Sequence, residues 1–172
     1  MNRIMRRLLL LDANIIIDLH TLGLFDRICK SYDVYVTPEV FKEADRYPAG
    51  GKYHKIFIKT KVKIIQDVAL ESIDEVLNEA REAWLSVDEG ETTSIAAIYQ
   101  RDMEDMVFCT CDKAAIKLVS FMNFDEQSIS LEKALKDAGY HKHNLYHQHS
   151  EKMFRECIQE GKALRVLYKK FS

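Results

Sequence analysis

The chain has 172 residues, of which 47 % are apolar and 30 % are charged, with only 6 Gly and 2 Pro. These values exclude a disordered or fibrous protein and allow one domain with a substantial core. The formal net charge is −2, so the chain is not a strongly basic nucleic-acid-binding domain. A local basic patch beside an acidic, metal-filled pocket is still compatible with this charge.

The chain carries no signal for a membrane or for a disulfide framework. No run approaches the ~18 consecutive apolar residues of a membrane-spanning helix. The apolar start is interrupted by Asp12 and Asn14, and no small-residue cleavage site follows. The cysteines do not have zinc-ribbon spacing, so we expect reduced structural thiols and a cytoplasmic protein. They are Cys29, Cys109, Cys111 and Cys157.

Strands and helices are predicted to alternate along the chain. The patterns predict strands at 8–11, 33–36, 62–65 and 106–109. They predict helices at 14–22, 24–29, 73–84, 89–100, 113–119 and 151–171, together with one that opens at Thr37-Pro38 and continues until Pro48-Ala-Gly-Gly51. Ser86-Val-Asp-Glu89 has the form of a capping box before the helix at 89–100. Such an alternation predicts a layered α/β fold with a parallel sheet.

Acidic residues stand where such a fold gathers functional groups. Asp12 and Asp112 each follow a predicted buried strand, and a charge in that place is costly unless it is paired, hydrated or bound to metal. Glu43 lies one helical turn after Glu39, and Glu91 lies in the first turn of its helix. Carboxylates that gather together repel one another unless a cation lies between them.

Oxygen ligands without Cys or His suit Mg²⁺ or Mn²⁺ rather than Zn²⁺. A metal held in this way can polarise a phosphodiester and activate water, so no nucleophilic side chain is required. The chain has no Gly-rich phosphate-binding loop and no Gly-x-Ser-x-Gly elbow. Nucleoside triphosphate and serine hydrolase chemistry therefore lack support.

Four blocks in order resemble the PIN-domain ribonucleases. They are Leu8-Leu-Leu-Leu-Asp12-Ala-Asn14-Ile-Ile-Ile-Asp18, then Val36-Thr-Pro-Glu-Val40 with Glu43, then Gly90-Glu91, and then Val107-Phe-Cys-Thr110-Cys-Asp112-Lys113. The segment Ile129-Ser-Leu-Glu-Lys-Ala-Leu135 is similar to the closing segment of the family. The resemblance covers roughly residues 8 to 137.

The resemblance implies a three-layer α/β/α sandwich with a central parallel sheet and an endoribonuclease. We expect single-stranded RNA as the substrate, because a compact pocket reaches a splayed strand more easily than a duplex. The resemblance also implies an acidic pocket that binds Mg²⁺ or Mn²⁺, formed by Asp12, Glu43, Glu91 and Asp112, with Asn14 and Thr110 as polar neighbours. Many family members are toxins of toxin–antitoxin pairs, and others process ribosomal or messenger RNA. An antitoxin protein and a homodimer are therefore the partners that the resemblance suggests besides RNA.

Two departures from the family pattern stand out. Cys111 occupies the place where many relatives carry a second acidic residue, which weakens the expectation of a fully occupied second metal position. A histidine-rich segment and a C-terminal helix also exceed the length of a minimal toxin. We expect residues 1–140 to form the nuclease domain and residues 141–172 to pack on it.

Each candidate residue also has a structural alternative. Asp12 and Asp112 can be helix N-caps, and Glu91 can be the partner of an Asp88 cap. Glu43 can be a solvated helix residue, with Glu39 as the ligand in its place. His141, His143, His147 and His149 can bind a transition metal, but their spacing does not fit one helical face and favours surface loops.

Basic residues form two stretches that can follow an RNA backbone or be solvated faces. They are Lys52, Lys55, Lys59, Lys61 and Lys63, with Tyr53 and Phe57 between them, and Lys162, Arg165, Lys169 and Lys170.

Two other functions stay open. A haloacid-dehalogenase-like phosphatase also begins with an apolar strand and an Asp, but it needs a second Asp where this chain has Asn14. A PIN-like domain without catalysis can serve as an RNA-binding or protein-interaction module.

Overall fold

The computed structural model describes residues 6–100, 105–141 and 145–169. A five-stranded sheet in the order β5-β2-β1-β6-β7 forms its centre, and every pair of neighbouring strands is parallel. The strands are β1 (Leu8–Leu11), β2 (Asp33–Val36), β5 (Lys63–Ile64), β6 (Met106–Cys109) and β7 (Ser128–Ile129).

Eight α-helices lie in the described residues. They are α1 (Ala13–Thr21), α2 (Phe25–Ser31), α3 (Pro38–Glu43), α4 (Leu70–Glu82), α5 (Glu89–Tyr99), α6 (Lys113–Phe121), α7 (Leu131–Asp137) and α8 (Glu151–Tyr168), with short 3₁₀ turns η1 (Asp125–Gln127) and η2 (His147–His149). None of the described helices combines the length and the apolar character that crossing a bilayer requires.

Two hydrophobic clusters cover the two faces of the sheet. Leu9 and Leu11 of β1 pack with apolar residues of α1, α2, α3 and α7, whereas Leu10 packs with α4, α5 and α6. All three leucines are buried, which explains why a strand of four consecutive leucines is stable between two helical layers. The predicted α/β sandwich with a central parallel sheet is therefore confirmed.

One helix prediction was wrong in its extent. The helix that begins at Pro38 ends at Glu43, and two antiparallel strands follow, β3 (Arg46–Ala49) and β4 (Lys52–Lys55). Gly50 and Gly51 join them with φ values of +58° and +74°. Two consecutive residues in the left-handed region form a tight hairpin turn, for which glycine is the least strained residue.

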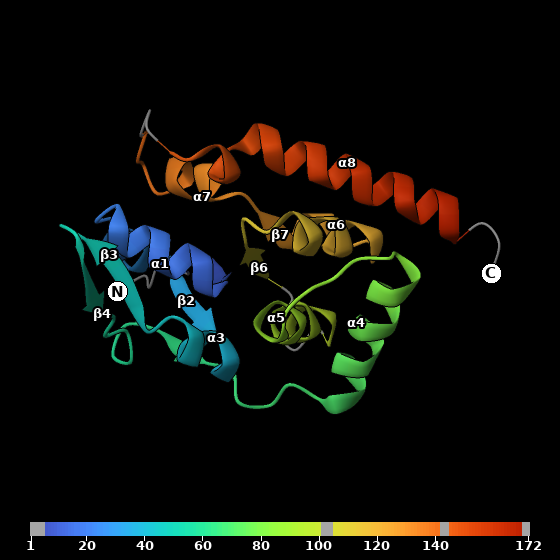
Figure 1. The fold of residues 1–172 in the computed structure, drawn as a ribbon, viewed down its shortest axis with the longest axis horizontal. Coiled ribbons are helices and arrows are strands. Elements are labelled where there is room, and N and C mark those ends of the chain that lie inside the picture. The colour runs from blue at the N-terminus through green and yellow to red at the C-terminus, as the bar shows by residue number, and fades with distance from the viewer. Residues whose placement is uncertain (1–5, 101–104, 142–144, 170–172) are drawn as a thin grey trace.

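Helix α8 packs on the outer side of α6 and forms a further layer (Figure 1). Ile116 of α6 is buried against Met153 and Cys157 of α8. The hydroxyl of Ser120 donates a hydrogen bond of 2.7 Å to the Ile158 carbonyl oxygen. The two helices come closest at Gly161, where a Cβ atom would lie 2.4 Å from the Lys117 carbonyl oxygen.

We expect Gly161→Ala to destabilise the protein, although alanine normally favours a helix over glycine by about 1 kcal/mol. The added methyl group would overlap backbone atoms of α6, and overpacking of this kind costs about 1–3 kcal/mol. Chemical denaturation measures the free energy of unfolding. Gln159→Ala, at an exposed position of α8, is the control and should change it by less than about 0.5 kcal/mol. An unchanged or higher stability of Gly161→Ala would contradict the close approach of the two helices.

Candidate metal-binding site at the ends of the central strands

Asp12 lies directly after β1 and caps the N-terminus of α1. Its side chain is only 2 % exposed. One carboxylate oxygen accepts a hydrogen bond of 2.8 Å from the Ala13 backbone N–H, and the other accepts one of 3.1 Å from the Thr110 hydroxyl. Burial raises the pKa of Asp12 to about 7, and nearby Asp88 and Glu43 add to the increase.

Thr110 connects Asp12 to Asp112 across the centre of the sheet. Strands β1 and β6 are neighbours in register, with Leu11 opposite Cys109, so the residues that follow them meet at one edge. The Thr110 oxygen accepts a hydrogen bond of 3.1 Å from the Asp112 backbone N–H. Asp112 caps α6 by accepting a hydrogen bond of 2.9 Å from the Ala115 N–H. Asp112 therefore caps α6 and also lies in the region of the other carboxylates.

Glu91 is held by a capping box at the start of α5. Its side chain accepts a hydrogen bond of 3.0 Å from the Asp88 N–H, and the Asp88 side chain accepts one of 2.8 Å from the Glu91 N–H. Asp88 is thus the cap of this helix, and the predicted box beginning at Ser86 was wrong. Glu91 is 4 % exposed, and burial raises its pKa to about 8, with contributions from Asp112, Asp88 and Asp12.

Glu43 reaches the same region from the last turn of α3. A surface pocket there is lined by Glu39, Lys42, Glu43, Asp88, Glu89 and Gly90. A Cβ atom at Gly90 would lie 3.1 Å from a carboxylate oxygen of Glu43, so the absence of a side chain at Gly90 lets α3 and α5 approach. Partial burial and Asp88 raise the pKa of Glu43. Glu39 lines the same pocket, so the structure keeps it beside Glu43 as a neighbouring carboxylate.

Each predicted carboxylate raises the pKa of at least one other through its charge, or has its own pKa raised by one, so the four lie in the same region. Glu91 is influenced by Asp112 and Asp12, and Asp12 by Glu43. Asp88 joins them, although the sequence indicated it only as a helix cap; its signal was the spacing Asp88-x-x-Glu91. Asn14 is exposed and has no hydrogen bond to these carboxylates among the described residues.

The four predicted carboxylates (Asp12, Glu43, Glu91 and Asp112, here called the acidic pocket) have the chemistry that a hard divalent cation requires. In the described residues, however, no three of these carboxylates have oxygens within 4.8 Å of one another, so a metal would have to draw them together. None of the ion pairs within residues 6–100, 105–141 and 145–169 includes any of the four. Two of the carboxylates are almost fully buried, and a buried carboxylate without a counter-charge is costly. Their donor atoms are all oxygens, which are the ligands of Mg²⁺ and Mn²⁺.

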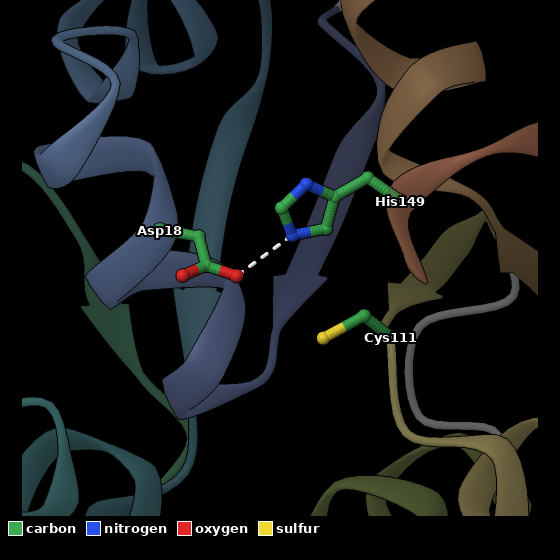
Figure 2. A group of neighbouring side chains, drawn as sticks. All are labelled: Asp18, Cys111 and His149. Carbon is green, nitrogen blue, oxygen red and sulfur yellow. Dashed lines mark hydrogen bonds and ion pairs between the residues drawn. The ribbon is translucent and has the colours of Figure 1, made fainter. Parts of the chain in front are cut away.

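His149 is a further departure from the sequence-based expectation. The sequence favoured surface positions for the histidines at 141–149, but His149 is buried in the η2 turn. Its ring lies beside Asp18 and Cys111, which come from distant parts of the chain (Figure 2). His141 and His147 are exposed as expected, and His143 lies outside the described residues.

Comparisons with family models, with curated proteins and with solved structures found no match to this chain.

Proposed function

We propose that the chain is a metal-dependent endoribonuclease that hydrolyses phosphodiester bonds of single-stranded RNA with Mg²⁺ or Mn²⁺. The observation that carries this proposal is the burial of two carboxylates, Asp12 and Glu91, neither of which forms an ion pair in the described residues. The pair lies at the carboxyl edge of the sheet, with Asp112 and Glu43 nearby. The resemblance to PIN-domain ribonucleases adds the substrate class, and also suggests an antitoxin as the partner.

In this proposal the protein supplies position and charge. A bound Mg²⁺ or Mn²⁺ would activate water and stabilise charge on the phosphate in the transition state. Thr110 fixes one oxygen of Asp12, and the capping box fixes one oxygen of Glu91. Because hydrogen bonds already hold each of these oxygens in the folded protein, the two side chains lose little conformational freedom when a metal binds.

The β3–β4 hairpin is the surface that we propose contacts the RNA backbone. It begins three residues after Glu43, and Lys52 and Lys55 on β4 are exposed. Tyr53 and Phe57 are 76 % and 75 % exposed. Exposed lysines can neutralise phosphates, and exposed aromatic rings can stack on splayed bases. A single strand offers such bases more readily than a duplex does.

We expect the double substitution Lys52→Gln and Lys55→Gln to weaken RNA binding and to reduce its salt dependence. Loss of two phosphate contacts would lower the slope of log K against log salt by about 1.4 for a single strand. Fluorescence anisotropy with Asp12→Asn protein, which should not cut the probe, measures this. The control is Lys30→Gln with Lys152→Gln, which removes the same charge from α2 and α8. An equal effect in the control would assign the change to net charge rather than to the hairpin.

The experiment that tests the proposed function is cleavage of a mixed set of labelled single-stranded RNAs with Mg²⁺ or Mn²⁺. EDTA and Asp12→Asn serve as controls, and a small phosphate ester is incubated in parallel. We expect cutting that requires both the metal and Asp12. If the folded protein binds Mn²⁺ and RNA but cuts none, the chain is a non-catalytic module. Phosphate release from the ester with intact RNA would instead indicate a phosphatase.

A further inference from the structure

Three side chains with different donor atoms meet on the side of α1 that faces the C-terminal segment. They are Asp18 of α1, Cys111 of the loop after β6, and His149 of η2 (Figure 2). One ligand atom from each lies within 4.8 Å of the other two. We propose that this Asp–Cys–His cluster is a zinc site, separate from the acidic pocket, which fastens the C-terminal segment to α1.

The three ligand atoms lie nearly as close to one another as the ligands of a bound zinc ion do. The Nε2 atom of His149 lies 2.7 Å from an oxygen of Asp18. Zinc bonds of about 2.0–2.3 Å in a tetrahedral arrangement place ligand atoms roughly 3.3–3.5 Å apart. The histidine and the aspartate would therefore separate slightly, and the thiol would move inward.

The donor set selects the class of metal. A thiolate, an imidazole and a carboxylate suit Zn²⁺, whereas Mg²⁺ prefers oxygen ligands alone. The amide of Gln148 lies 3.4 Å from Asp18 and 4.0 Å from the Cys111 sulfur. Because the oxygen and nitrogen of an amide can exchange places by a flip of the side chain, Gln148 can supply a fourth ligand.

The cluster also contains a deeply buried imidazole. His149 has a fully buried side chain, and its Nδ1 atom has no hydrogen-bond partner among the described residues, where Asp18 is the one polar contact of the ring. A divalent cation held by these three side chains would stabilise the Cys111 thiolate.

The ligands come from segments that are far apart in the chain. Asp18 and His149 are 131 residues apart, and η2 leads directly into α8 through Ser150, which caps that helix. A metal at this place would cross-link the first helix to the start of the last one. Cys111 thereby acquires a role at the position where the resembling family often carries an acidic residue.

The test is titration of the metal-free full chain with Co²⁺, which reports a thiolate ligand through a near-ultraviolet charge-transfer band. We expect one equivalent of Co²⁺ to give this band, Zn²⁺ to displace it, and excess Mg²⁺ to leave it unchanged. Cys111→Ser should abolish the band, and Asp18→Asn and His149→Asn should each weaken binding at least about 10-fold. Zn²⁺ should also raise the unfolding temperature of the wild type but not of Cys111→Ser.

Two matched controls separate the cluster from other ligands. Cys29→Ser removes another half-buried thiol, and His147→Asn removes the exposed histidine of the same turn. Both should keep the band, and so should Asp12→Asn, because the acidic pocket contains no sulfur. Absence of the band in the wild type, or its persistence in Cys111→Ser, would overturn the zinc site. Neither result affects the ribonuclease proposal, which is tested by cleavage with Mg²⁺ or Mn²⁺.

Discussion

Asp12→Asn should lower metal-dependent RNA cleavage by more than about 100-fold, because even groups that only orient metal ligands are worth 10–100-fold. The substitution removes the charge but keeps the oxygen that accepts the Ala13 N–H, so the N-cap of α1 is preserved. Asp12→Ala would also remove the cap, at a cost of about 1 kcal/mol in stability, so a loss of cleavage could not be separated from a loss of folded protein. Initial rates of cleavage in Mn²⁺ measure the loss.

The same variant should be more stable than the wild type when metal is absent. The pKa of Asp12 rises from 3.8 to about 7 in the fold. Ionisation of this buried group therefore costs up to about 4 kcal/mol at pH 8, since each pKa unit corresponds to about 1.4 kcal/mol. Asp74→Asn, at an exposed position of α4, is the control and should change neither rate nor stability. Wild-type cleavage by Asp12→Asn would refute the proposed role of this carboxylate.

Binding of Mn²⁺ should strengthen by about 100-fold or more between pH 6 and pH 8. Metal ligands must be deprotonated, and Asp12 and Glu91 have pKa values of about 7 and about 8 in the metal-free protein. At pH 6 both carboxyls are mainly protonated, so the metal competes with two protons; at pH 8 it competes with one or fewer. Electron paramagnetic resonance of free Mn²⁺ measures the affinity.

The stability of the metal-free protein should change in the opposite direction with pH. Both pKa values are raised by folding, so the folded state holds protons that the unfolded state releases above about pH 4. Stability from these groups is present at low pH and is lost as the pH rises through about 7 to 8. Asp12→Asn should show a smaller loss and should remove about one proton from the pH dependence of Mn²⁺ binding. A pH-independent affinity would show that neither carboxyl binds the metal.

The sequence predicted the central sheet except for β7, and it predicted the edge at which Asp12 and Asp112 lie, because these depend on local pattern. Apolar runs at 8–11 and 106–109 end in Asp12 and Thr110-Cys-Asp112, and parallel strands bring such ends together. The register of β1 with β6 then places Thr110 against Asp12. Asn14 was expected beside them from the resemblance to PIN-domain ribonucleases; on α1 it is exposed and forms no hydrogen bond to these carboxylates among the described residues.

Other features could not be predicted because they depend on contacts between distant segments. The β3–β4 hairpin has little apolar alternation, since its strands are largely exposed, and only the Gly50-Gly51 pair indicated a turn. The burial of His149 depends on Asp18, which lies in a different helix. No local spacing of histidines reveals such a pairing. Asp88 showed its cap pattern, but its closeness to Glu43 arises from the approach of α3 to α5.

The packing of α8 on α6 also determines where the chain tolerates being cut. Helix α6 packs apolar residues against the sheet on one side and, through Ile116, against α8 on the other. The side of α6 that contacts α8 is therefore not exposed to solvent. A fragment ending near residue 140 would expose this strip to water, together with the part of α6 around Lys117 and Ser120 that Gly161 covers in the full chain. Such a fragment would be prone to self-association. The last helix is therefore as much a part of the folding unit as the sheet, and an expression tag or a fused partner belongs beyond it.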